Sequence, residues 1–145
     1  MPETPLKLEF VFFDIGGTLL DRHQDSGDFF SFPSSIGLLK SVKSMGARVG
    51  IITTLGAVMT NADAWRLLRI FDLDTFIDPQ GLVSDHDAGV AKPHPQIFAF
   101  AAARVGSTVD RCLFVGENLT EVIGARLAGM HAILKPCPPG RDLPG

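Results

Sequence analysis

The stretch LEFVFFDIGGT, residues Leu8–Thr18, decides the fold of this protein. Its first six residues form a short apolar run that contains Phe and Val and stops at Asp14. This length and composition predict a strand that is buried on both faces. Gly16 and Gly17 then interrupt regular structure directly after the strand. A lone acid at the end of a buried strand is therefore the first candidate functional residue.

Similar apolar runs recur along the chain and alternate with amphipathic segments. We expect strands at residues 8–13, 49–52, 75–77, 112–115 and 131–134, and helices at residues 34–45, 61–70, 96–105 and 120–128. Residues 19–33 are expected to form a loop or small flap, and residues 79–90 a loop rich in Gly and Asp. This alternation predicts an α/β fold, with a parallel sheet of about five strands and helices on both faces.

Polar residues follow three of the expected strands. They are Asp14, the pair Thr53 and Thr54, and Glu117 after Gly116. In parallel α/β sheets, ligands bind outside the carboxyl ends of the strands. The sequence therefore predicts that these positions converge on one site.

The bulk properties limit the classes of function. The 145 residues fit one domain, expected at residues 1–135, with a Pro- and Gly-rich tail at residues 136–145. A net charge of −3 gives no reason to expect nucleic acid or an anionic membrane as a partner. An anionic substrate is still compatible with an acidic protein, because a metal ion or backbone N–H groups can bind it.

The expected location is the cytoplasm. The N-terminus has no basic segment followed by an apolar run, and no apolar run reaches the roughly 18 residues of a membrane helix. The two cysteines are too few for a disulfide-stapled scaffold. We expect Cys112 to be buried in a strand and Cys137 to lie in the tail.

Four segments, in order, resemble the motifs of the haloacid dehalogenase-like hydrolases. They are FFDIGGTLLD (residues 12–21), VGIITT (49–54), GVAKPHPQIF (89–98) and LFVGENLTEVIGARLAGM (113–130). The resemblance implies a Rossmann-like sheet with the strand order last, fourth, first, second, third. The spacing of the motifs leaves no room for the cap domain of larger family members, so an open site is expected.

The resemblance also implies a role for each motif residue. Asp14 would be the nucleophile that forms an aspartyl-phosphate, Lys92 would stabilise the transferring charge, and Thr53 would bind a phosphate oxygen. Gly17, Thr18 and Thr54 are candidate substrate-binding residues. Mg²⁺ is the implied cofactor, and its ligands would be Asp14, the Gly16 carbonyl, Glu117 and Glu121.

Two departures from the family pattern weaken the expected activity. Gly16 stands where the family has its general acid/base, whose loss typically costs about 10²–10⁴-fold in rate. Glu117 and Glu121 stand where the family has Asp, and their longer arms change the geometry available to Mg²⁺.

These observations leave three functions open. The first is a Mg²⁺-dependent phosphatase, slow and acting on a phosphorylated small molecule or macromolecule. The second is a catalytically weak module that binds a partner or a phosphorylated ligand. The third is a metal-free dehalogenase-like hydrolase, which is disfavoured because such enzymes use a cap to build their halide site. The oligomeric state does not follow from the sequence.

Overall fold

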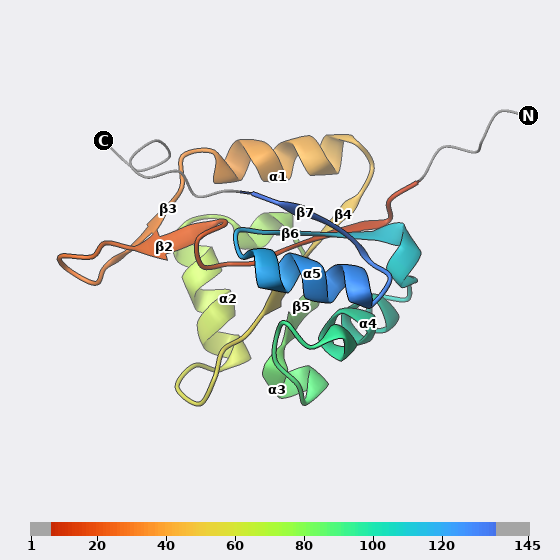
Figure 1. The fold of residues 1–145 in the computed structure, drawn as a ribbon. Coiled ribbons are helices and arrows are strands. Elements are labelled where there is room, and N and C mark those ends of the chain that lie inside the picture. The colour runs from red at the N-terminus through yellow and green to blue at the C-terminus, as the bar shows by residue number, and fades with distance from the viewer. Residues whose placement is uncertain (1–6, 136–145) are drawn as a thin grey trace, which may run out of the picture.

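The central sheet has the strand order β5-β4-β1-β6-β7, and all its strand pairs are parallel (Figure 1). The computed structural model describes residues 7–135, so Cys137 and the expected tail lie outside the described residues. The strands are β1 (Phe10–Phe13), β4 (Arg48–Thr53), β5 (Ile77–Ser84), β6 (Cys112–Gly116) and β7 (His131–Leu134). This order is the one that the motifs predict, and the α/β fold class is confirmed.

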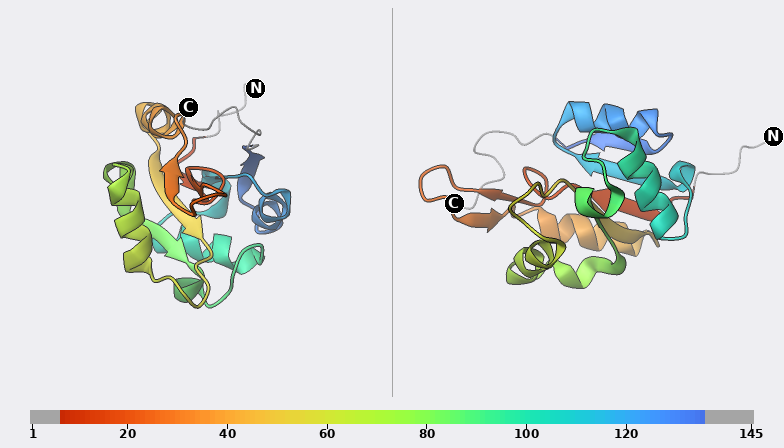
Figure 2. Two further views of the ribbon diagram at one scale, coloured as in Figure 1. Left: turned by 90° about the vertical axis from the view of Figure 1, so that its left-hand side faces the viewer. Right: turned by 90° about the horizontal axis from the view of Figure 1, so that it is seen from below.

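Two layers of helices cover the two faces of the sheet. Helices α1 (Ser35–Ser44) and α2 (Asn61–Ile70) lie on one side, and α4 (Pro95–Arg104) and α5 (Leu119–Leu127) lie on the other (Figure 2). With two exceptions, described below, the predicted elements occur within two residues of their expected bounds.

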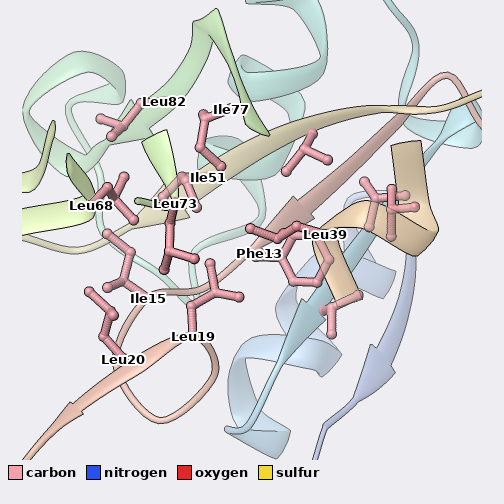
Figure 3. Close-up of a cluster of buried hydrophobic side chains, with 14 of the residues drawn as sticks. Phe13, Ile15, Leu19, Leu20, Leu39, Ile51, Leu68, Leu73, Ile77 and Leu82 are labelled. Atoms are coloured by element: carbon pink, nitrogen blue, oxygen red, sulfur yellow. The ribbon is translucent and has the colours of Figure 1, made fainter. Parts of the chain in front are cut away.

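The central strand β1 is buried on both faces, as its apolar sequence predicts. Successive side chains of a strand point to opposite faces, so Val11 and Phe13 pack with α1 and α2, whereas Phe10 and Phe12 pack with α4 and α5. Figure 3 shows the first of these clusters, in which Phe13 lies among leucines and isoleucines from the neighbouring elements. Burial on both faces fixes the end of β1 rigidly in the molecule.

The prediction for residues 75–90 is wrong. The structure has a 3₁₀ turn at Asp74–Phe76, then strand β5, and then the short helix α3 (Asp85–Ala88). Pro79 and Gly81 suggest a loop in the sequence, but β5 is an edge strand, where a proline need not interrupt the hydrogen-bonded ladder. The register of the β4–β5 pair also shifts between Val49 and Ile51.

The segment expected as a loop or flap is a β-hairpin. Strands β2 (Leu20–Arg22) and β3 (Phe29–Ser31) pair in antiparallel fashion. The hairpin projects beyond the carboxyl end of β1, past the ends of the sheet strands (Figure 1). It stands beside the end of the sheet at which a site is predicted.

No inserted domain separates the strands within residues 7–135. The chain between β1 and β4 forms the hairpin and α1, and the chain between β4 and β5 forms α2 and the 3₁₀ turn. In the same residues, no helix is long and apolar enough to cross a membrane.

Candidate active site

Asp14 directly follows β1 and lies at the centre of the carboxyl end of the sheet. Its backbone N–H donates a hydrogen bond to the carbonyl of Val115 on the neighbouring strand, over 3.0 Å. Only 8% of the residue is exposed. Thr53 ends β4 and is also buried, and Glu117 follows the end of β6. The predicted convergence of the strand-end residues therefore occurs.

Lys92 reaches Asp14 from a distant part of the chain. Its Nζ lies 2.7 Å from Oδ1 of Asp14 and 2.7 Å from Oε1 of Glu121. The lysine side chain is 2% exposed, and its ammonium also lies 5.4 Å from the ring centre of Phe114. A buried charge needs such partners, because desolvation of an unpaired ammonium is costly. The two carboxylates thus hold Lys92 at the end of β1.

Helix α5 packs closely against the segment that carries Lys92. A methyl group at Gly124 would lie 2.1 Å from the carbonyl oxygen of Pro93, so only glycine allows the helix to come this close. At the start of the helix, the side chain of Asn118 accepts a hydrogen bond from the N–H of Glu121 and fixes the first turn. The contact between α5 and the Lys92–Pro93 segment sets the distance between Glu121 and Lys92.

Glu117 adds a third carboxylate to this cluster. Its side chain lies against the backbone of Gly17, where a methyl group would come within 2.5 Å of Cγ. Gly17 also has a φ of +75°, a conformation that favours glycine. Burial, followed by repulsion from Asp14 and Glu121, raises the pKa of Glu117. Asp14, Glu117 and Glu121 together carry more negative charge than Lys92 neutralises.

The donors at this end of the sheet fit Mg²⁺. They are the carboxylates of Asp14 and Glu117 and the carbonyl of Gly16, and Mg²⁺ prefers oxygen ligands. Among residues 7–135, no three His, Cys, Asp or Glu side chains are grouped closely enough to hold an ion by themselves. Mg²⁺ sites typically use one or two carboxylates and several waters, so they need no such group. Glu121 is a weaker candidate ligand because its Oε1 pairs with Lys92.

The turn after Asp14 uses some of its backbone donors internally. The N–H groups of Gly17 and Thr18 donate to the carbonyls of Leu20 and Ile15, and Thr18 is fully buried. Their role in substrate binding stays a prediction, which these hydrogen bonds do not favour. Within the described residues, the N–H groups of Ile15 and Gly16 have no backbone acceptor. Ile15, which directly follows Asp14, is thus a candidate phosphate donor that the sequence motifs did not indicate.

Thr54 and Asp85 shape the loop after β4. The hydroxyl of Thr54 accepts a hydrogen bond from the backbone N–H of Lys92, over 3.1 Å. Asp85, absent from the sequence-based candidates, accepts hydrogen bonds from the N–H groups of Leu55 and Gly56. Burial acts to raise the pKa of Asp85, but these two hydrogen bonds, together with the N–H of Asp85 itself and the charge of His86, lower it overall. The only hint in the sequence is the N-cap pattern Ser84-x-x-Asp87 around it.

A model of the haloacid dehalogenase-like hydrolases matches residues 25–129. The chain belongs to this family. The matched region contains Thr53, Lys92 and Glu117 but begins after Asp14, so this match does not bear on Asp14. Lys92 and Glu117 of this haloacid dehalogenase-like hydrolase therefore lie in the region that matches the family model.

Curated relatives of this haloacid dehalogenase-like hydrolase are phosphatases. The chain is 34% identical to the glyceraldehyde 3-phosphate phosphatase of Methanothermobacter thermautotrophicus over 104 residues, which are 71% of this chain and 43% of that protein. It is 29% identical to the phosphoglycolate phosphatase of Caulobacter vibrioides over 71% of this chain and 41% of that protein. The chain thus spans less than half the length of these relatives.

Solved structures share the fold of this haloacid dehalogenase-like hydrolase. A HAD phosphatase from Thermococcus onnurineus matches with a TM-score of 0.72 and 20% identity, over 88% of this chain and 86% of that chain. An uncharacterised protein from Listeria monocytogenes matches with a TM-score of 0.76 and 22% identity, over 94% of this chain and 85% of that chain.

Gly16 remains the main departure of this haloacid dehalogenase-like hydrolase from the family motif. The residue is exposed, and a methyl group built on it would meet no atom within 4 Å. Sterics therefore do not require glycine here. The position leaves open space close to Asp14, where the family motif has a carboxylic acid.

Proposed function

We propose that this domain hydrolyses phosphate esters or acyl phosphates of small molecules, through an aspartyl-phosphate on Asp14 and with Mg²⁺ as cofactor. The observation that carries the proposal is the 2.7 Å contact between Asp14 Oδ1 and the buried ammonium of Lys92 at the carboxyl end of the sheet. Family membership and the phosphatase activities named for its relatives support the same reaction class.

Asp14 performs the covalent step in this proposal. Lys92 engages Oδ1, so the other carboxylate oxygen attacks the phosphorus atom. The bond from phosphorus to the leaving oxygen breaks, and its electron pair departs with the leaving group. Water then attacks the phosphorus, its proton passes to solvent, and the carboxylate of Asp14 is regenerated with release of phosphate. Two easier displacements replace one difficult displacement.

Lys92 and the turn after β1 stabilise the transferring charge. The lysine ammonium lies against the nucleophile, and the N–H groups of Ile15 and Gly16 supply donors without a backbone acceptor among the described residues. Fixed donors in a partly buried site stabilise developing charge because they need little reorganisation. Mg²⁺, held by Asp14, Glu117 and the Gly16 carbonyl, would neutralise the phosphoryl oxygens and reduce repulsion between them and the acids.

Gly16 limits the range of leaving groups. No side chain at this position donates a proton to the departing oxygen, so the leaving group must depart as an anion or take its proton from water. An alkoxide is a poor leaving group and a phenolate or carboxylate a good one. We therefore expect alkyl phosphates to react about 10²–10⁴-fold more slowly than they would with an acid at position 16.

The test is a hydrolysis assay with and without Mg²⁺ on acetyl phosphate, para-nitrophenyl phosphate and glycerol phosphate. We expect the first two to be hydrolysed in a Mg²⁺-dependent way, and Asp14→Asn to abolish this hydrolysis. Asp25→Asn, an exposed acid at the tip of the hairpin, is the matched control and should keep wild-type activity. Turnover that survives Asp14→Asn would contradict the mechanism.

A module that only binds a phosphorylated ligand is the second candidate, because Gly16 removes the acid/base. It requires ligand binding without Asp14-dependent turnover on any of the three substrates. Hydrolysis that Asp14→Asn abolishes excludes this candidate.

A further inference from the structure

A pocket of about 280 Å³ lies between the β2–β3 hairpin and the loop that follows β4. Its walls are mostly apolar and include Ile15, Leu20, Phe29, Leu55, Met59 and Leu67. The charged residues Asp21 and Arg22 of the hairpin also line it. Ile15 and Leu20 belong to the hydrophobic cluster of Figure 3, where they lie at one end of the labelled residues. The pocket is thus an extension of the core that reaches the surface.

This pocket opens onto the candidate active site. Gly16, Thr53 and Thr54 line it together with the apolar residues, and Gly16 and Thr53 flank Asp14 at the ends of β1 and β4. Gly16 faces open space at this point, since a methyl group there would meet no atom within 4 Å. A group attached to a phosphate at Asp14 has direct access to the apolar walls.

The outer wall of the pocket is held in place by its own contacts. The guanidinium of Arg22 lies 4.3 Å from the ring centre of Phe29, which is half-buried on the hairpin. On the opposite side, Asp85 fixes the loop of Leu55 and Met59 through the N–H groups of Leu55 and Gly56. The pocket is therefore formed before a ligand arrives, which reduces the cost of ordering it on binding.

We propose that this pocket binds the leaving group, and that the domain selects phosphate monoesters of small phenols. This proposal rests on the proposed function. A cavity of about 150 Å³ lined by Leu, Ile and Phe binds benzene, so the pocket has room for one substituted aromatic ring. A phenol also departs readily as a phenolate, which suits a site without an acid at position 16. The shape of the pocket and the chemistry of the site favour the same substrate class.

The first test measures binding without turnover. Wild-type protein with Mg²⁺ is titrated calorimetrically with phenylphosphonate and with methylphosphonate, which share the phosphonate group and differ in apolar bulk. We expect phenylphosphonate to bind at least about 10-fold more tightly, as differences of this size are typical of apolar pockets. Equal dissociation constants for the two phosphonates would overturn the proposal.

Variants then locate the preference in this pocket. Phe29→Ala and Met59→Ala remove apolar wall from two different elements, and each should reduce the preference to about 3-fold or less. Met59→Trp fills the pocket and should weaken phenylphosphonate binding while methylphosphonate binding stays unchanged. Val58→Ala is the matched control, because Val58 lies on the same loop, is 91% exposed and does not line the pocket. An unchanged preference in all three pocket variants would contradict the assignment.

Kinetics separate this proposal from the proposed function. Phe29→Ala should raise KM for phenyl phosphate by a larger factor than KM for acetyl phosphate, since acetyl phosphate lacks apolar bulk to contact this wall. Equal effects on both substrates would refute the pocket and leave the phosphatase function intact. Selective binding of phenylphosphonate by a protein that hydrolyses no phosphate would support the pocket and refute the phosphatase function.

Discussion

Substitution of Gly124 by alanine tests how closely α5 must approach Lys92. The added methyl group would lie 2.1 Å from the carbonyl oxygen and 2.9 Å from the carbonyl carbon of Pro93, whereas ordinary contact begins at 3.4 Å. Both atoms belong to the backbone, so the helix and the Lys92–Pro93 segment must separate by about 1.3 Å. Because Glu121 lies on the same helix, this separation also disturbs its contact with Lys92.

The stability and the activity of Gly124→Ala should respond differently. Overpacking costs about 1–3 kcal/mol, and replacement of a helical glycine returns about 1 kcal/mol, so the net loss of unfolding free energy is about 0–2 kcal/mol. A shift of about 1 Å in a catalytic group can lower the rate about 100-fold. We therefore expect a folded variant with kcat for acetyl phosphate reduced about 100-fold.

The assay for this prediction combines urea unfolding with initial rates under saturating Mg²⁺. The control is Gly37→Ala, also within a helix, where an added methyl group meets no atom within 4 Å. This control should gain about 1 kcal/mol of stability and keep wild-type kcat. Wild-type kcat in Gly124→Ala would refute the claim that this close approach positions Lys92.

Three further substitutions probe charged residues of the candidate site and of the loop after β4. Lys92→Met leaves the carboxylates of Asp14 and Glu121 without their buried counter-charge, so urea unfolding should show a loss of about 3–5 kcal/mol of unfolding free energy. The control Lys40→Met, at an exposed lysine, should lose less than about 0.5 kcal/mol. Burial and repulsion raise the pKa of Glu117 above its usual 4.5, so its charged form opposes folding as the pH rises through that pKa. Without divalent cations, Glu117→Gln should therefore have a higher Tm than wild type at pH 7, and this difference should vanish below about pH 4. Mg²⁺ should raise the Tm of wild type more than that of the variant. Hydrogen bonds keep the pKa of Asp85 below 3.8, so its contribution to stability is present above that pH and is lost as the pH falls through the lowered pKa. Asp85→Ala should cost about 1 kcal/mol of unfolding free energy at pH 7 and speed amide exchange at Leu55 and Gly56. Unchanged exchange at these two amides would contradict the anchoring role of Asp85.

The fold was predictable wherever an apolar run determined the structure by itself. The segment FVFF is buried on both faces, and its alternation between two core clusters follows from the geometry of a strand. Strand β5 was predicted too early in the chain and too short, at residues 75–77, because its pairing depends on its neighbour. A methyl group at Gly81 would lie 3.1 Å from Cα of Gly50 on β4, so these two glycines allow a close approach that local propensity does not reveal.

The candidate site was predictable as a set of strand ends but not as a set of contacts. Parallel topology brings Asp14, Thr53 and Glu117 to one edge, and the motif resemblance indicates Lys92. The pairing of Lys92 with Glu121 depends on how closely α5 packs, and Thr54 proves to bind the backbone of Lys92. The apolar pocket joins a hairpin to a loop that lies far from it in the sequence, so only the tertiary structure reveals it.

The central claim is that Asp14 is phosphorylated during turnover. Protein mixed with acetyl phosphate and Mg²⁺ is treated with borohydride, which reduces an aspartyl-phosphate to homoserine, and peptide mass spectrometry then locates the modified residue. We expect homoserine at position 14, dependent on substrate and absent when Asp14→Asn is treated in the same way. Acetyl phosphate hydrolysis with an unmodified Asp14 would contradict the central claim.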